Sequence, residues 1–220
     1  MNIITQTADG SNTLYNETIG EHYHSKHGAL QESKHVFIEA GLKFASAGKS
    51  EISIFEVGFG TGLNFILSFE YCLKNNIKLN YTSLEAFPLT LEVINQTGYS
   101  EYVSKEVWTD FISNYNKALK EPTDIAPLCT LEIPHIKLAE FNTDKKFDLV
   151  YYDAFSVQHQ PEMWSDEIIT HTCNLLKPGG TFVTYAITGK LKRAVKACNF
   201  TIEKLPGAPG KREMLRAIKM

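Results

Sequence analysis

The chain has 220 residues, of which 43% are hydrophobic and 21% charged, and its formal net charge at pH 7 is −3. This length suits one α/β domain with a full hydrophobic core, or such a domain with a small extension. The composition argues against a membrane protein, because no segment approaches the roughly 18–20 consecutive apolar residues that a membrane-spanning helix needs.

The charge is distributed unevenly along the chain. Residues 177–220 contain ten lysines and arginines and two acidic residues, about +8, whereas residues 1–176 carry about −11. Such an asymmetry indicates a carboxyl-terminal part that faces a polyanion. The alternative is a solvated basic helix and strand that bind no partner.

The amino-terminal stretch MNIITQTADGSN is polar and lacks the basic-then-apolar order of a signal peptide. Four cysteines are scattered without C-x-x-C spacing, which favours a reduced, cytoplasmic protein in which they serve for packing. They are Cys72, Cys129, Cys173 and Cys198. His22, His24 and His27 could suggest a metal site, but no second group of ligands stands at a familiar spacing, so we expect no metal.

Taken in chain order, the hydrophobic pattern predicts short strands that alternate with helices. Residues 1–20 are expected to form loops or short strands, with a turn at 9–12. Helices are expected over 30–42, 63–73, 103–111, 112–119, 161–176 and 189–198, and Lys177-Pro178-Gly179-Gly180 is expected to stop the fifth of these. Strands are expected over 52–57, 79–84, 129–133, 147–152, 181–186, 200–205 and 214–218. This order predicts a doubly wound α/β sheet that ends in two adjacent strands.

A glycine-rich turn joins the strand at 52–57 to the following helix. Gly58, Gly60 and Gly62 follow Glu56 in G-x-G-x-G spacing, and residues without Cβ let backbone and ligand approach closely. The dinucleotide fingerprint G-x-G-x-x-G would need glycine at 63, where this chain has Leu63. The turn therefore predicts a nucleotide-type ligand other than a dinucleotide, and the alternative is an ordinary strand-to-helix turn.

Two further acidic residues follow predicted strands. Glu85 ends the second strand, where a carboxylate can accept hydrogen bonds from both hydroxyls of a ribose. Asp153, followed by Ala154 and Phe155, comes directly after the fourth strand. Because ligands of doubly wound sheets lie beyond the carboxyl ends of the strands, we expect both acids to meet the glycine turn. The alternative for Glu85 is an acid exposed at a strand end.

Several motifs together resemble the methyltransferase domain of the MnmC proteins, which belongs to the class I methyltransferases that use S-adenosylmethionine (SAM). The resemblance covers roughly residues 20–219. Its motifs are GEHYHSKHGALQESKHVF, VGFGTGLNF, LEAFPLT, YYDAF with PEMW shortly after, LLKPGGTFVTY and GKREML. It implies a Rossmann-like, mostly parallel seven-stranded sheet with an antiparallel carboxyl-terminal hairpin. It also implies an extension over residues 1–44, packed beside the active site of a methyltransferase domain over 45–220.

The resemblance implies a SAM-dependent N-methyltransferase. The family converts 5-aminomethyl-(2-thio)uridine to 5-methylaminomethyl-(2-thio)uridine at wobble position 34 of tRNA, so the partner expected is the anticodon region. Bifunctional members continue into an oxidoreductase domain that binds FAD. Because this sequence ends at Met220, we expect a stand-alone enzyme without FAD, in the form of a monomer.

Two departures from the family pattern stand near the expected site. The family's Asp-Gly-Phe-Ala-Pro is replaced by residues 153–157, Asp-Ala-Phe-Ser-Val. The Gly-Asp that contacts adenine in the family is replaced within residues 134–137, so a backbone amide or Asn142 is expected to take that part.

The resemblance assigns roles to individual residues of this chain. Asp153 is expected to hold and orient the substrate amine, as a general base or as a carboxylate that only organises the loop. The cofactor is expected to contact Glu56, Gly58, Phe59, Gly60, Gly62, Asn64 and Glu85. For the tRNA, the expected contacts are Tyr23 and Phe155 (with Trp164) stacked on an extruded base, and Lys211 and Arg212 on phosphates. A basic rim is expected from Lys190, Lys192, Arg193 and Lys196. The alternative for the aromatic residues is core or loop packing.

Three other functions share these features. A methyltransferase acting on small-molecule amines, or an aminopropyltransferase using a decarboxylated relative of SAM, would have the same fold and cofactor carboxylates. The basic carboxyl-terminal part favours RNA over both. A non-catalytic SAM- or RNA-binding module is the third alternative, and the presence of Glu56, Glu85 and Asp153 argues against it.

Overall fold

An eight-stranded sheet forms the centre of the molecule, in a computed structural model that describes residues 2–220. The strand order is β10-β11-β9-β8-β4-β5-β7-β6, and the strands from β9 to β7 run parallel. The bounds are β4 Glu51–Val57, β5 Lys78–Leu84, β6 Thr123–Ala126, β7 Cys129–Glu132, β8 Phe147–Tyr152, β9 Leu176–Thr184, β10 Phe200–Pro206 and β11 Glu213–Lys219. The mostly parallel sheet with an antiparallel carboxyl-terminal hairpin is as predicted.

The sheet has one strand more than the seven predicted. Residues 123–126 form β6, which pairs antiparallel with β7 at the edge of the sheet. This strand has only four residues, too few for a recognisable alternation of apolar and polar residues next to the helical pattern that precedes it. Its hydrogen-bond partner β7, rather than its own sequence, makes it a strand.

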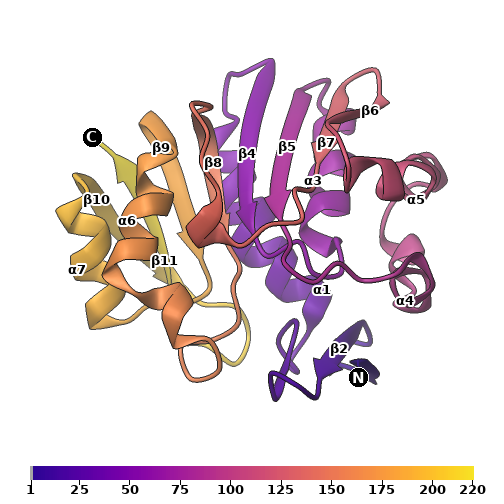
Figure 1. The fold of residues 1–220 in the computed structure, drawn as a ribbon, viewed down its shortest axis with the longest axis horizontal. Helices are drawn as coiled ribbons and strands as arrows, with labels where there is room; N and C mark the ends of the chain where they lie inside the picture. Colours follow the sequence, from indigo (N-terminus) through magenta and orange to yellow (C-terminus); the bar gives the residue numbers. More distant parts are fainter. Residues whose placement is uncertain (1) are drawn as a thin grey trace.

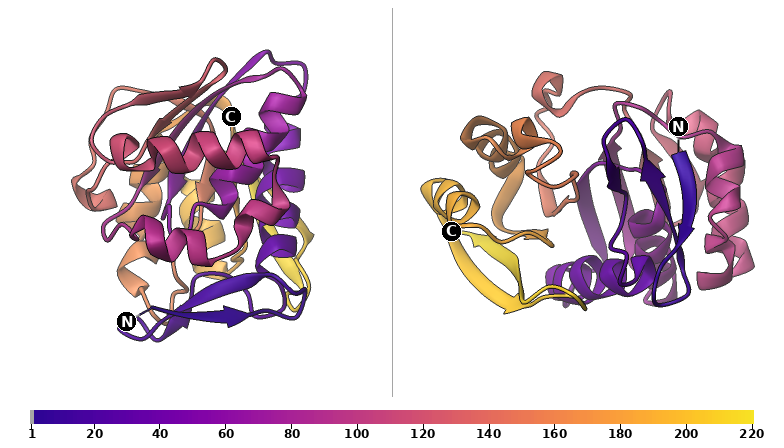
Figure 2. Two further views of the ribbon diagram at one scale, coloured as in Figure 1. Left: turned by 90° about the vertical axis from the view of Figure 1, so that its right-hand side faces the viewer. Right: turned by 90° about the horizontal axis from the view of Figure 1, so that it is seen from below.

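Alternate residues of the central strands face two separate cores. On β8, Tyr151 lies against Phe37 with ring centroids 5.1 Å apart, whereas Tyr152 lies on the other face against Phe182 at 5.5 Å. Helices α1 to α3 and α5 cover the first face, and α6 and α7 cover the second (Figure 2). Apart from Asp148, the strand FDLVYY is apolar at every position, as two-sided burial requires.

Each predicted helical range contains a helix, α4 lies outside the predicted ranges, and several boundaries differ. Their bounds are α1 Ala29–Glu32, a π-helical segment Ser33–Leu42, α2 Lys43–Ala45, α3 Leu63–Lys74, α4 Leu91–Gln96, α5 Lys105–Ala118, α6 Asp166–Asn174 and α7 Gly189–Ala197. The patterns at 103–111 and 112–119 form the single helix α5. Short 3-10 helices span Tyr99–Tyr102, Leu138–Glu140 and Pro161–Trp164.

The helix predicted over 161–176 is divided at Ser165. This residue is extended and its side chain accepts a hydrogen bond from Ile168 N, so it caps a new helix, α6, after the 3-10 turn. The expected stop at residues 177–180 lies inside β9 instead. The β8–β9 register shifts between Phe147 and Leu149, so these residues form an irregular start of the strand.

A second, three-stranded sheet precedes the main one in the chain. It consists of β1 Asn2–Gln6, β2 Asn12–Asn16 and β3 Glu21–His22, and it lies at the carboxyl ends of the parallel strands (Figure 1). The helical segment 29–45 packs on the face of the main sheet. A domain boundary at residue 44 stays a prediction. Within residues 2–220, no helix combines the length and the apolar character needed to cross a membrane.

Candidate functional site

The glycine turn lies over the ends of β4 and β5. The backbone N–H groups of Gly58 and Phe59 both donate to the carbonyl oxygen of Leu84, at 3.2 and 3.1 Å. Gly58 has φ +87°, and a Cβ on it would lie 2.9 Å from the carbonyl oxygen of Asp153. The turn therefore needs glycine here both for its left-handed backbone and for the close approach of β8.

Glu85 is part of this turn. Its Oε2 accepts from Gly60 N at 2.9 Å and its Oε1 from Phe87 N at 2.8 Å. The carboxylate is half-buried, and each oxygen retains a second lone pair. It is thus fixed at the tip of β5 and can still accept hydrogen bonds from a ligand, as expected for a group that binds ribose hydroxyls.

One asparagine joins the two other predicted carboxyl groups. Asn64 Nδ2 donates to Glu56 Oε1 at 3.0 Å and to Asp153 Oδ2 at 2.8 Å. Glu56 is 1% exposed and also accepts from the hydroxyl of Ser83 at 2.7 Å. Asn64 Oδ1 is buried and has no hydrogen-bond partner within the described residues. The network therefore offers an unused acceptor at the start of α3.

Both carboxyl groups of this network favour the protonated form more than usual. Burial raises the pKa of Glu56 to about 8, against hydrogen bonds from Ser83 and Asn64 that lower it. Burial, and then the nearby Glu32 carboxylate, raise the pKa of Asp153 to about 7. Asp153 can therefore exchange a proton near neutral pH, which is what a general base requires.

The side chain of Phe59 points away from this network. It is 3% exposed and packs 6.0 Å from the rings of both Phe111 and Tyr115. Any contact of Phe59 with a ligand would be made by its backbone, and its side chain serves the core.

A cavity of about 620 Å³ lies between the three-stranded sheet and the loop that follows Asp153. Tyr23, Phe155 and Lys211 line it, which brings together three of the four residues predicted to bind substrate. The rings of Tyr23 and Phe155 meet edge to face, with centroids 5.1 Å apart. Arg212, the fourth, is exposed and is not among the lining residues.

Lys211 is oriented into this cavity. Its Nζ lies 2.6 Å from Glu32 Oε2 and 3.7 Å from the centroid of the Tyr185 ring. Neither Glu32 nor Tyr185 was predicted as a site residue. Glu32 lies within the motif at 20–37, but only its 5% exposure and its partner distinguish it from other helical glutamates.

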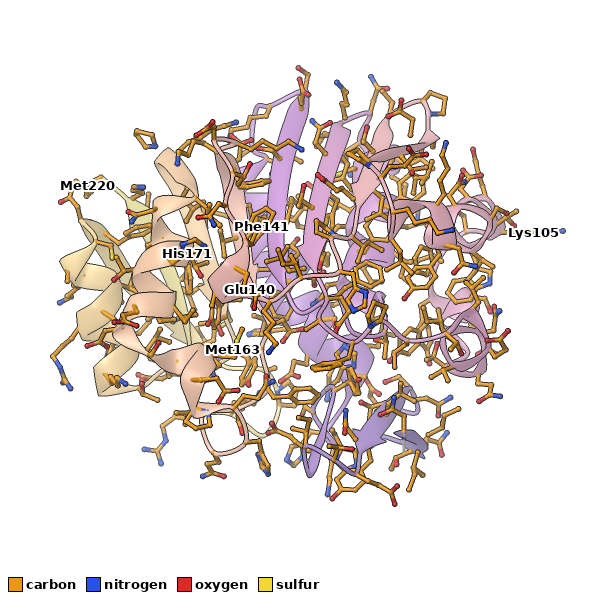
Figure 3. The ribbon with its side chains drawn as sticks, in the orientation of Figure 1. Lys105, Glu140, Phe141, Met163, His171 and Met220 are labelled. Atoms are coloured by element: carbon orange, nitrogen blue, oxygen red, sulfur yellow. The ribbon has the colours of Figure 1, made fainter. Side chains whose placement is uncertain are left out.

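Two residues considered at the sequence level lie elsewhere. Trp164 is 6% exposed, and its indole N–H donates to the carbonyl of Phe155 at 2.8 Å, so it supports the loop rather than presenting its ring. Asn142 is exposed and donates to the carbonyl of Glu140. Figure 3 labels the preceding residues Glu140 and Phe141, and the ring of Phe141 stacks on that of Phe55 in β4 with centroids 5.4 Å apart.

Beside Glu85, residues of the loop after β7 contact the end of β5. His135 Nε2 donates to the carbonyl oxygen of Ala86 at 3.0 Å. The loop after β7 therefore reaches the end of β5 through an imidazole.

The three histidines considered as metal ligands in the sequence do not all face one site. His22 and His24 line the cavity, whereas His27 packs against Gly210. Burial lowers the pKa of His24 to about 4. Among residues 2–220, no three His, Cys, Asp or Glu side chains are arranged to hold a metal ion.

Comparison with known proteins places this site in a family. A family model described as S-adenosyl-L-methionine-dependent methyltransferase matches residues 96–220. The chain belongs to this family. The doubly wound sheet, the glycine turn and the acid at the tip of β5 are thus parts of a SAM-dependent methyltransferase.

Relatives of this methyltransferase match it over most of its length. It is 31% identical over 204 residues to the "tRNA 5-methylaminomethyl-2-thiouridine biosynthesis bifunctional protein MnmC" of Leptospira borgpetersenii, covering 88% of this chain and 31% of that protein. The same-named protein of Polaromonas naphthalenivorans is 27% identical, with coverage of 96% and 34%. The methyltransferase spans about a third of the length of these curated relatives. The resemblance to the MnmC proteins is confirmed.

Solved structures share the fold. The crystal structure of MnmC2 from Aquifex aeolicus aligns with a TM-score of 0.76 at 23% identity, covering 99% of this chain and 70% of that one. Spermidine synthase from Thermotoga maritima aligns with a TM-score of 0.54 at 12% identity, covering 98% and 71%. The predicted class I methyltransferase fold is confirmed.

Proposed function

We propose that this methyltransferase transfers a methyl group to the primary amine of 5-aminomethyl-(2-thio)uridine at wobble position 34 of tRNA. The observation that carries the proposal is Asp153, a half-buried carboxyl group beside the glycine turn that directly precedes Ala154 and Phe155, which line the cavity. The relatives named for tRNA 5-methylaminomethyl-2-thiouridine biosynthesis support the same substrate.

The residues at the ends of β4 and β5 fit SAM. The glycine turn leaves no Cβ between backbone and ligand, Glu85 retains lone pairs for the ribose hydroxyls, and Asn64 Oδ1 is a buried acceptor without a partner. We assign cofactor binding to Glu56, Gly58, Gly60, Gly62, Asn64 and Glu85, with the backbone of Phe59. When bound, SAM supplies a methyl group on a cationic sulfur.

For this reaction the protein must position the two reactants and accept one proton. A bond forms between the amine nitrogen and the methyl carbon while the carbon–sulfur bond breaks, and the nitrogen loses a proton. Asp153, with a pKa of about 7, is placed to hold that nitrogen and accept the proton. Tyr23 and Phe155 line the cavity and would stack on the extruded uridine base.

The basic carboxyl-terminal part would meet the tRNA backbone. Arg212 is exposed in the β10–β11 loop, and Lys190, Arg193 and Lys196 are exposed on α7, which follows β9 in the chain. Such side chains bind phosphates and position the anticodon region without reading its sequence. We propose that the enzyme acts as a monomer in the cytoplasm, where its free cysteines stay reduced.

A methyl-transfer assay tests the proposal. Purified protein and radiolabelled SAM would be incubated with two bulk tRNA preparations, one from cells that make 5-aminomethyluridine but lack the final methylation, the other from wild-type cells. We expect label only in the first, in 5-methylaminomethyl uridine on nucleoside analysis. Label in neither preparation, despite measurable SAM binding, would overturn the tRNA substrate, and label in a free amine would indicate a small-molecule methyltransferase.

A further inference from the structure

Two distant parts of the chain meet at the wall of the substrate cavity. The loop between β10 and β11 lies against the segment that follows β3, where a Cβ on Gly210 would overlap the His27 imidazole at 2.2 Å. His35 Nε2 donates to the carbonyl of Pro206 at 2.8 Å. Beside these contacts lies the ion pair of Lys211 with Glu32, which is 179 residues away in sequence.

This ion pair differs from the other lysine–glutamate pairs of the molecule in its burial. The Glu32 side chain is 7% exposed, whereas the Lys43–Glu39 pair on the same helical segment is 44% and 56% exposed. The second partner of Glu32 is the backbone N–H of Ser25, which donates at 3.0 Å. Burial of a carboxylate is costly unless the group is paired and hydrogen-bonded, and Glu32 has both kinds of partner.

A chain of contacts leads from this pair to the reacting group. The Lys211 ammonium lies over the ring of Tyr185, whose hydroxyl donates to the carbonyl oxygen of Ala154 at 2.9 Å. Ala154 directly follows Asp153. Movement of Lys211 would therefore release the ring that holds the Asp153 loop.

The pair also dominates the charge near Asp153. After burial, the Glu32 carboxylate makes the largest contribution to raising its pKa, and the Lys211 ammonium lowers it. The other titratable groups that interact with Asp153 are Glu56, Tyr81 and Tyr185. Both tyrosines stay neutral, because burial raises their pKa values. Glu56 lies on the opposite side of Asn64 and does not touch the pair.

We propose that Glu32 and Lys211 are positioning residues for Asp153: together they fix the loop that carries it and set the charge that its carboxyl group faces. In this proposal Lys211 positions the Asp153 loop from within the cavity, and the contacts with tRNA phosphates are made by Arg212 and the basic residues of α7. The inference rests on the proposed function only in taking Asp153 as the group that receives the proton.

The titration of Asp153 gives a test that needs no turnover. The carboxyl carbon signal of Asp153 would be followed by NMR against pH in protein labelled with ¹³C-aspartate, and assigned by its loss in Asp153→Asn. In Glu32→Gln the Lys211 charge remains and the Glu32 charge is gone. We expect the midpoint of the Asp153 titration to fall by about 0.5–1 pH unit, as for a carboxyl that loses a nearby like charge.

Matched variants separate charge from packing. Glu39→Gln removes an exposed carboxylate from the same helical segment and should leave the midpoint in place. Lys211→Arg keeps the charge and should also leave it in place. Should Glu32→Gln fail to fold, the uncharged pair Glu32→Gln with Lys211→Met replaces it. This pair should lower kcat at least tenfold at an unchanged KM for SAM, which a pair needed only for folding would not do once the protein is folded.

An unmoved or raised midpoint in folded Glu32→Gln would overturn the positioning role, as would an unchanged kcat in the folded uncharged pair. The failure of the proposed function looks different. If tRNA is not the substrate, wild-type protein transfers no label to it, while the NMR titration of Asp153 still reports the influence of Glu32.

Discussion

Asn64 is the side chain through which Glu56 and Asp153 share one hydrogen-bond network. Its two amide hydrogens are both used, one on each carboxyl group, at 3.0 and 2.8 Å. Two buried carboxyl groups this close cannot both ionise without cost, and each has a raised pKa as a result of burial first. The functional consequence is that these carboxyl groups change between their protonated and deprotonated forms near neutral pH.

Replacing Asp153 tests that consequence. We expect Asp153→Asn to lower kcat about 100-fold or more, since the amide cannot accept the amine proton, while SAM still binds. In the wild type the carboxyl is deprotonated above its pKa of about 7, so kcat/KM should rise with pH through that value. Methyl transfer over pH 5–9 and calorimetric SAM binding measure both effects. Asp144→Asn, an exposed acid, is the control, and a pH profile in Asp153→Asn equal to the wild type would contradict the base role.

At Gly58, the cost of a left-handed backbone can be compared with the cost of a steric contact between a Cβ and a neighbouring strand. Gly58 and Gly48 have φ +87° and +73°, but only at Gly58 would a Cβ meet a neighbouring atom, the Asp153 carbonyl oxygen. Alanine at either position should cost about 1–2 kcal/mol of backbone strain. Only Gly58→Ala should also weaken SAM binding, because it pushes the turn away from β8. Thermal unfolding and SAM titration distinguish the variants, and equal SAM affinity in both would refute the close-contact explanation.

Among the elements, β4, β8 and β9 are joined at their amino ends by Asp148. Its Oδ2 accepts from Ser53 N at 2.9 Å and Ser53 Oγ at 2.6 Å, and Lys177 Nζ lies 3.0 Å away. Ser53 is on β4 and Lys177 on β9, so one carboxylate holds three neighbouring strands. The carboxyl ends of the same strands carry the glycine turn, Asp153 and Tyr185.

Asp148 should contribute to stability in a pH-dependent way. Burial alone would raise its pKa, but hydrogen bonds from Ser53 and the pairs with Lys177 and Lys49 outweigh burial and hold the pKa well below its usual range. A carboxyl whose pKa is depressed on folding stabilises the protein above its unfolded pKa and loses that contribution as pH falls towards the folded value.

Urea unfolding of Asp148→Asn at several pH values measures this contribution. We expect a loss of about 1–2 kcal/mol at pH 7, allowing for partial solvent screening, and a smaller loss at pH 3. Asp124→Asn, at an exposed edge position, serves as the control. A loss in Asp148→Asn that grows on acidification would contradict the assignment.

At the scale of the whole molecule, exposed basic residues of the carboxyl-terminal part lie at one edge of the sheet. Lys190, Arg193 and Lys196 are exposed on α7 beside β10, at the edge formed by the carboxyl-terminal strands. Lys105 on α5 marks the opposite edge (Figure 3). The net charge of −3 conceals this basic edge, and a polyanion would be directed to α7.

Charge reversal at the two edges tests this arrangement. Arg193→Glu with Lys196→Glu should weaken tRNA binding about tenfold or more, and lower the slope of log affinity against log salt by about 2. Lys105→Glu at the start of α5 with Lys120→Glu just after its end makes the same charge change and should have little effect. Filter binding at several salt concentrations measures both. Equal losses in the two variants would show a general charge effect instead of a binding edge.

Prediction from sequence was most accurate where one short segment contains its own signal. The strand 147–152 was predicted to the residue, and the glycines and the acids at 85 and 153 were placed correctly at the strand ends. The four-residue strand β6 and the break at Ser165 were missed, because a partner strand and a cap decided them. The contact of Phe59 with the cofactor stays a prediction, and the structure adds that its side chain lies in the core, since sequence does not show the direction of a side chain in a turn.

The sequence by itself therefore determined the order of strands and helices, the fold class and the carboxylates that meet at the glycine turn. These features follow from the hydrophobic periodicity and from motifs within short segments of the chain. Neighbouring parallel strands also place their carboxyl ends at the same edge of the sheet, whatever the other packing contacts are. Only the tertiary structure decided that Lys211 pairs with Glu32, that Asn64 bridges two acids and that Asp148 joins three strands. Such contacts join residues far apart in the chain, so they form only when packing brings the groups together. Once a charged group is buried, it needs a partner of opposite charge or a hydrogen bond.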